Sequence, residues 1–279
     1  MTEPVKADLV LVDITDTVAT VRLNRPPLNA FDNELRIRLG EVVRRLTDDA
    51  SVRAVVLTGN EKAFAVGADL AQLESMGYEQ ISGWNRALQR VFDEIARLPV
   101  PVVAAVNGYA LGGGLELALA ADFRIFGAAA HVALPEVELG IVPGAGGMQR
   151  LRRLIGTSKA KDLIMSGRRV AAAEAVSLGL GEQVVAVEDL VAEAGEFAAR
   201  LARGPRFALQ AIKEALDLGE DSSLAAGLAF DRNVLAGLFA TSDRAIGMAS
   251  FRADGPGRAV FGGEADPSRI GPNFAVEGT

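Results

Sequence analysis

The N-terminal residues of the chain follow two hydrophobic periods in succession. Apolar and polar residues alternate over 10–14 and again over 19–23, which predicts two strands joined by a turn at Asp16-Thr17. Apolar residues then recur at intervals of three and four from Leu35 to Leu46, which predicts an amphipathic helix. The chain is therefore expected to begin with a hairpin followed by a helix.

Buried strands are predicted where apolar residues follow one another without alternation. Such runs lie at 52–58, 102–106 and 123–126, and 132–134 is a shorter candidate. Strand-loop-helix units recur in this way from residue 10 to about residue 187. This order predicts an α/β fold with parallel strand pairing, because parallel strands need a crossover connection such as a helix.

The segment after the first buried run has no clear period. Residues 60–71 predict a loop. Residues 72–83 predict a mobile segment, because Gly77 and Gly83 would interrupt a helix. A helical stretch then follows and ends at Leu98, because Pro99 and Pro101 cannot continue it.

The pattern becomes purely helical after residue 188. Gly204-Pro205 and Gly219 are expected to separate the first three of the predicted helices. The predicted helices cover residues 189–203, 206–218, 222–239 and 242–253. We therefore expect an α/β core over 1–188, a helical region for packing or assembly over 189–262, and a flexible tail over 263–279.

Composition narrows the functional classes. The chain has 29 Lys and Arg against 36 Asp and Glu, and the formal charge of −7 argues against a nucleic-acid or anionic-membrane surface. The absence of cysteine excludes disulfides, thiolate metal sites and a cysteine nucleophile. The single histidine, His131, removes most zinc sites and most serine-histidine catalytic sites. No signal-peptide pattern and no apolar stretch of roughly 20 residues occurs. We expect a cytoplasmic protein.

Two glutamates stand in apolar, glycine-rich surroundings. Glu116 follows Gly112-Gly113-Gly114, and Glu136 follows a proline and precedes the glycine-rich stretch 140–147. Burial disfavours the charged form of a carboxylate and moves its pKa towards neutrality, which suits general acid–base catalysis. Taken alone, Glu116 also fits a helix N-terminus and Glu136 also fits an exposed position. As a pair they predict acid–base chemistry.

Two loops are suited to close approach by a ligand. Residues 65–69 and residues 112–114 contain glycines, which expose main-chain N–H groups without a Cβ in the way. The second loop also begins a predicted helix, whose free N–H groups and dipole favour negative charge. Donors converging from both loops would form an oxyanion hole. Residues 112–114 alone would equally fit a tight turn that binds nothing.

Five short segments form a combination of motifs that is highly specific. They are 23–26, 28–30, 63–69, 107–116 and 135–150. These segments resemble the signatures of the enoyl-CoA hydratase/isomerase (crotonase) family. The resemblance covers roughly residues 8–262, and it implies a crotonase-like spiral of ββα units with a C-terminal helical trimerisation region. Members are commonly trimers or dimers of trimers, so a homo-oligomer is implied here.

The resemblance also assigns roles to residues. It places the thioester oxygen of an acyl-CoA on the N–H groups of Ala68 and Gly113, and it makes Glu116 and Glu136 the catalytic carboxylates. No metal or redox cofactor is implied, because coenzyme A is part of the substrate. The substrate-binding residues it implies are Arg25, Ala65, Gly67, Asp69, Leu70, Tyr109 and Gly112.

Retention of both glutamates favours one reaction of the family. That reaction is the syn addition of water to a trans-2-enoyl-CoA to give a 3-hydroxyacyl-CoA, as in fatty-acid β-oxidation or related acyl-CoA metabolism. Glu116 would then deprotonate water and Glu136 would supply the proton at the α-carbon. Two alternatives stay open. One is a delta3-delta2 enoyl-CoA isomerase or another family reaction, and the other is an acyl-CoA-binding or assembly protein without turnover.

The sequence departs from the family pattern where coenzyme A phosphates are expected. Pro27 alone stands where many hydratases carry a basic residue and one more, and Ala71 stands where some members carry a lysine. The candidates that remain for phosphate contacts are Arg25, Lys62 and Arg258.

Overall fold

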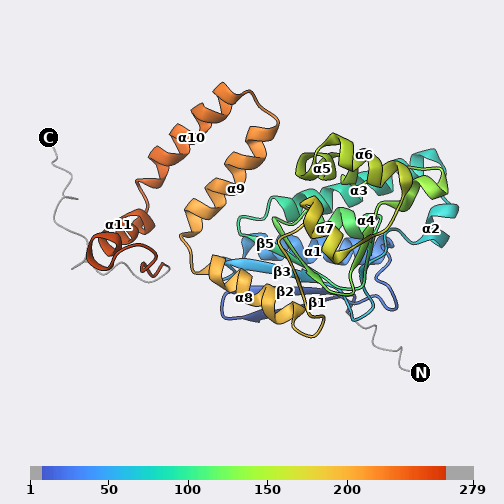
Figure 1. Cartoon of the computed structure of the whole chain (residues 1–279), viewed down its shortest axis with the longest axis horizontal. Helices are drawn as coiled ribbons and strands as arrows, with labels where there is room; N and C mark the ends of the chain where they lie inside the picture. Colours follow the sequence, from blue (N-terminus) through green and yellow to red (C-terminus); the bar gives the residue numbers. More distant parts are fainter. Residues whose placement is uncertain (1–7, 262–279) are drawn as a thin grey trace. The chain divides into compact units, whose positions relative to one another are not determined.

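The computed structural model describes residues 8–261 (Figure 1). These residues divide into two compact units, with the boundary between Ala199 and Arg200. The predicted tail over 263–279 lies outside the described residues. No helix within residues 8–261 has the length and apolar character needed to cross a membrane.

The larger sheet of the first unit has six strands in the order β1-β2-β3-β5-β7-β10. β1 and β2 form the predicted antiparallel hairpin, and the remaining neighbours pair in parallel, which confirms the predicted α/β class. The three central strands are almost entirely buried because helices and loops cover both faces. The strands are β1 (Val10–Thr15), β2 (Val18–Leu23), β3 (Ala54–Thr58), β5 (Val102–Val106), β7 (Phe123–Gly127) and β10 (Gln183–Val185).

A second sheet has four short strands in the order β4-β6-β8-β9. β4, β6 and β8 pair in parallel, and β9 pairs antiparallel with β8. The prediction of a continuous loop over 60–71 was therefore wrong, since β4 and the start of α2 lie within it. The elements are β4 (Ala63–Ala65), β6 (Tyr109–Leu111), β8 (His131–Ala133), β9 (Val170–Ala171) and α2 (Leu70–Glu74).

Two amphipathic helices pack against each other in the first unit. α1 (Asn33–Asp48) begins where the sequence predicts, with Asp32 as its cap, and it contacts α3 (Tyr78–Ala96). The prediction that Gly83 interrupts a helix was wrong, because α3 runs through it. Gly83 is exposed and disfavours the helix by only about 1 kcal/mol. The buried apolar face that outweighs it comprises Trp84, Leu88, Val91, Phe92 and Ile95.

The remaining helices of the first unit follow the second sheet or close the larger one. α8 (Leu190–Ala202) packs on β7: the rings of Phe123 and Phe197 are 5.0 Å apart, and Leu190 is buried. Most of α8 thus belongs to the first unit, one helix beyond the predicted end of the core. The others are α4 (Gly113–Ala118), the 3-10 helix η1 (Pro135–Leu139), α5 (Gly147–Ile155), α6 (Thr157–Ser166) and α7 (Ala172–Leu178).

The second unit consists of α9 (Arg206–Glu220), α10 (Leu224–Leu238) and α11 (Ser242–Asp254). α9 and α10 run side by side (Figure 1) and contact each other. α9 continues through Gly219 and ends at Glu220, so the break follows the predicted one and lies before Ser223, which caps α10. Neither α9 nor α10 has a fully buried residue. The large apolar side chains exposed on the three helices include Phe207, Ile212, Leu216, Leu224, Leu235 and Phe251.

Candidate active site

Glu116 is buried at the start of a short helix. It lies in the first turn of α4, and only 2% of the residue is exposed. Its Oε1 atom accepts hydrogen bonds from Ala145 N at 2.7 Å and from Gly147 N at 2.8 Å. A Cβ on Gly147 would lie 2.9 Å from Glu116 Cγ, so glycine permits this approach. The loop thus holds Glu116 through one oxygen, while Oε2 makes no hydrogen bond within residues 8–261.

Side chains from α3 fix the loop that holds Glu116. Asn85 Nδ2 and Gln89 Nε2 both donate to Gly144 O, at 2.9 and 2.6 Å. Arg150 donates to a carbonyl of the same loop and pairs with Asp93 at 2.5 Å. Asn85, Gln89 and Asp93 are spaced four apart, so they lie on one face of α3. None of these three was predicted from the sequence, where the four-residue spacing was the available signal.

Glu136 lies beside the glycine loop that begins α4. It occupies the first turn of η1, and its Oε2 is buried without a hydrogen-bond partner within residues 8–261. Gly112 has φ +53°, and a Cβ built on it would lie 2.8 Å from Glu136 Oε1. Glycine at 112 therefore serves both the turn and the approach of the carboxylate. The structure thus brings Glu136 to the N-terminal end of the helix that carries Glu116.

The surroundings of the two carboxylates shift their pKa values through different balances of causes. Burial, with a smaller contribution from the neighbouring charge of Glu116, raises the pKa of Glu136 to about 7. Burial also raises the pKa of Glu116, but the N–H groups of Gly147 and Ala145 oppose this shift by binding the ionised form. With a pKa of about 7, Glu136 can therefore both hold and release a proton near neutral pH, while the two N–H groups favour the ionised form of Glu116.

The unusual pKa of Glu136 makes stability depend on pH. Its ordinary pKa is 4.5 and its pKa in the folded protein is about 7, so the folded state holds more protons between these values. The free energy of unfolding should therefore fall as pH rises from about 4.5 to about 7, and it should level off above that range. Thermal unfolding at one protein concentration should show a smaller fall for Glu136→Gln than for wild type. Parallel curves would contradict this pKa.

Two main-chain N–H groups come from glycine loops that touch each other. Gly67 has φ +85°, and a Cβ built on it would lie 3.2 Å from Gly113 N. Phe31 N donates to Gly67 O, and Asp69 N donates to Phe31 O. In this parallel bridge Gly67 O and Asp69 N both bond to Phe31, so the N–H group of Ala68, which lies between them, points away from Phe31. Neither Ala68 N nor Gly113 N donates to an acceptor within residues 8–261, so both are available to a ligand oxygen.

Ala65 and Gly67 support this pair of loops, whereas Leu70 lies at its edge. A Cβ on Gly114 would overlap the carbonyl oxygen of Ala65, so the two loops touch through main chain. Leu70 begins α2 and is half exposed. Tyr109 packs its ring near His131 and under the guanidinium of Arg169, at 5.7 Å. The substrate contacts expected of these residues stay predictions, as do those of Lys62 and Arg258.

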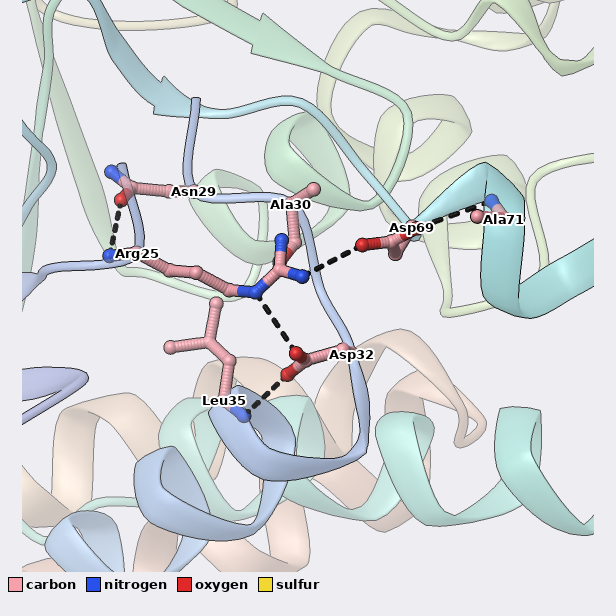
Figure 2. Close-up of polar contacts among 7 residues, drawn as sticks. All are labelled: Arg25, Asn29, Ala30, Asp32, Leu35, Asp69 and Ala71. Atoms are coloured by element: carbon pink, nitrogen blue, oxygen red, sulfur yellow. Dashed lines mark hydrogen bonds and ion pairs between the residues drawn. The ribbon is translucent and has the colours of Figure 1, made fainter. Parts of the chain in front are cut away.

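Arg25, another expected substrate ligand, is engaged within the chain (Figure 2). Its Nε donates to Asp32 Oδ2 at 2.9 Å and its Nη2 donates to Asp69 Oδ2 at 2.7 Å. Its Nη1 donates to Ala30 O at 3.2 Å. The guanidinium holds the pKa of Asp69 below its usual range. Each nitrogen of the guanidinium thus already binds an acceptor of the protein.

Together these features define a class of site. Two carboxylates with raised pKa values lie near two free N–H donors, which is the arrangement required to polarise a carbonyl and move a proton at the adjacent carbon. The carboxylate pair and the N–H donors therefore define an acid–base enzyme acting next to a carbonyl group. Residues 8–261 contain no cluster of three or more His, Asp or Glu side chains that could hold a metal ion.

Comparison with known proteins agrees with this class. The family model described as enoyl-CoA hydratase/isomerase matches residues 13–256. YngF of Bacillus subtilis is 43% identical over 248 residues, which are 88% of this chain and 95% of that protein. The mitochondrial enoyl-CoA hydratase of Pongo abelii is 37% identical over 237 residues, which are 85% and 81% of the two chains. The chain belongs to the enoyl-CoA hydratase/isomerase family.

A solved structure shows the same fold. The enoyl-CoA hydratase of Bacillus anthracis superposes with a TM-score of 0.85 at 40% sequence identity, and the match covers 88% of this chain and 96% of that one. The predicted crotonase-like architecture is therefore confirmed, and the protein is an enzyme of this family.

Proposed function

We propose that the protein is an enoyl-CoA hydratase, which adds water syn to a trans-2-enoyl-CoA and yields a 3-hydroxyacyl-CoA. The observation that carries the proposal is the meeting of Glu116 and Glu136 at one end of α4, beside the free N–H groups of Ala68 and Gly113. Relatives about 40% identical over most of the chain carry the name of this activity.

Each part of the site has one task in this reaction. The thioester oxygen accepts hydrogen bonds from Ala68 N and Gly113 N, which withdraws electrons from the conjugated double bond. Glu116 takes a proton from water as the water oxygen bonds to C3, and the π electrons of C2=C3 move towards the thioester. Glu136 then delivers its proton to C2 as the enolate collapses. The step leaves Glu116 protonated and Glu136 ionised, and proton exchange restores the pair.

The reaction requires neither a metal nor a redox cofactor. Water supplies both the hydroxyl group at C3 and, through the carboxylate pair, the hydrogen at C2, so the substrate undergoes no net oxidation or reduction. The proposed substrate is an acyl-CoA thioester of fatty-acid β-oxidation or related acyl-CoA metabolism. The cysteine-free sequence fits a cytoplasmic setting, which is part of the proposal.

A second family reaction is supported by the surroundings of Glu136. Its unpartnered Oε2 and its pKa of about 7 allow it both to accept and to donate a proton. A delta3-delta2 isomerisation needs only one such group. Glu116→Gln should abolish hydration, and a 3-enoyl-CoA substrate would show whether this variant still shifts the double bond.

The proposed function is tested by following the absorbance of the conjugated thioester. Crotonyl-CoA and a longer trans-2-enoyl-CoA should both lose this absorbance in the presence of the enzyme, and the two rates would rank acyl chain length. Binding of both substrates without any loss would reject hydration in favour of a protein that binds acyl-CoA without turnover.

We also propose that the chain assembles into homotrimers or dimers of trimers. The support is the set of large apolar side chains exposed on α9, α10 and α11, because exposed apolar surface of this kind marks interaction sites. Sedimentation equilibrium should give three or six times the mass of the chain. A monomer at micromolar concentration would reject the assembly without affecting the assignment of the active site.

A further inference from the structure

Arg25 connects the caps of two helices. Asp32 Oδ1 accepts from Leu35 N at 2.8 Å, which caps α1, and Asp69 Oδ1 accepts from Ala71 N at 3.1 Å, which caps α2. The second oxygen of each carboxylate binds Arg25 (Figure 2). One guanidinium therefore ties two segments that lie 37 residues apart in sequence, from Asp32 to Asp69, through charge-assisted hydrogen bonds.

The two segments that Arg25 ties together are the two sides of the bridge that presents Ala68 N. On one side, Arg25 holds Ala30 O and the carboxylate of Asp32, which flank Phe31. On the other side, it holds the carboxylate of Asp69, the residue after Ala68. The bridge between Phe31 and Ala68 is thus fastened on both sides by the same side chain.

The bridge is also anchored in the core. The Phe31 side chain is fully buried, and its ring meets that of Phe92 edge to face at 5.6 Å. The segment 66–69 has no comparable anchor, because its side chains are small or partly exposed. The position of the Ala68 N–H group relative to Gly113 N therefore depends on what holds Asp69.

We propose that Arg25 is a positioning residue that sets the place of the Ala68 N–H in the oxyanion hole, rather than a ligand of the coenzyme A phosphates. The inference rests on the proposed function. A misplacement of about 1 Å in such a site reduces the rate about 10²-fold. Arg25→Met should leave the Ala68 N–H group, one of the two donors, less firmly positioned. We therefore expect kcat to fall about 10- to 100-fold.

The kinetic test compares two substrates that differ in phosphate. Crotonyl-CoA carries the phosphates and crotonyl-pantetheine lacks them, while both present the same thioester. Arg25→Met should lower kcat by the same factor with both. Arg25→Lys keeps the positive charge but cannot reach two carboxylates and a carbonyl together, so its kcat should be little higher than that of Arg25→Met. Asp69→Asn keeps the helix cap, removes the ion pair and should behave like Arg25→Met.

A matched control removes a different arginine from the same part of the chain. Arg38 lies on α1 and pairs with Glu41 at 2.9 Å, and both side chains are about half exposed. Arg38→Met should leave kcat and KM unchanged with both substrates. A rise in KM confined to crotonyl-CoA in Arg25→Met, with recovery in Arg25→Lys, would instead show a phosphate ligand and would overturn the proposal.

A spectroscopic readout separates the inference from the proposed function, because it needs binding but no turnover. Butyryl-CoA labelled with 13C at the thioester carbonyl should show its C=O stretch shifted to lower frequency when bound to wild type. The shift should be smaller in Arg25→Met and Asp69→Asn, and unchanged in Arg38→Met. A full shift in Arg25→Met would overturn the inference even in an enzyme that does not hydrate. No shift in wild type would overturn both claims.

Discussion

Replacement of Glu136 by glutamine should lower kcat for hydration of crotonyl-CoA by about 10²–10⁴, with little change in KM. Glutamine keeps the size of the side chain but cannot deliver a proton to C2. The pKa of about 7 gives Glu136 this ability at neutral pH, and burial beside Gly112 is the reason for that pKa. Steady-state kinetics with wild type and variant provide the measurement.

Glu138 provides the control for this substitution. It lies two residues further along η1 and is exposed, so Glu138→Gln removes a carboxylate from the same helix without touching the site. Its kcat and KM should match those of wild type. An unchanged kcat in Glu136→Gln would remove this carboxylate from the mechanism, whereas an equal loss in both variants would point to a disturbed helix.

Replacement of Gly113 by proline should lower kcat about 10²–10³-fold or more, because proline removes one donor of the oxyanion hole. Gly113 is the first residue of α4, a position that tolerates proline because its N–H has no partner within the helix. The ring carbon bonded to the nitrogen would also take the place of the donated hydrogen. Saturation kinetics should show the loss in kcat, and thermal unfolding should show that the fold persists.

Gly113→Ala separates loss of the donor from the added bulk. A Cβ at this position would lie 3.3 Å from Gly67 Cα, so alanine fits after a shift of a few tenths of an ångström, and it keeps the N–H. Alanine should therefore retain much more activity than proline. Equal activity of the proline variant and wild type would show that Gly113 N does not contact the reacting oxygen.

The elements with long hydrophobic periods could be predicted from the sequence. The hairpin of β1 and β2, the helix α1 and the buried strands β3 and β5 all lie where the apolar pattern places them. β4 and β6 have three residues each, which is too short for a period to appear. Their pairing depends instead on distant segments, which the local pattern does not contain.

The chemical groups of the site were easier to predict than their supports. Glu116 and Glu136 stand out because carboxylates in glycine-rich apolar segments are unusual, and the structure brings their elements together. Asn85 and Gln89 act on a loop more than 50 residues away, through hydrogen bonds to a carbonyl that any residue would carry. Arg25 was identified, but its partners Asp32 and Asp69 could be found only from the fold.

The central claim is that this site adds water across a double bond conjugated to a thioester. The most direct test is to incubate the enzyme with crotonyl-CoA in water enriched in 18O and to analyse the product by mass spectrometry. We expect 3-hydroxybutyryl-CoA with one 18O atom at C3, formed by wild type and about 10²–10⁴ times more slowly by Glu136→Gln. Recovery of unlabelled crotonyl-CoA, of its double-bond isomer, or of free coenzyme A as the sole product would contradict it.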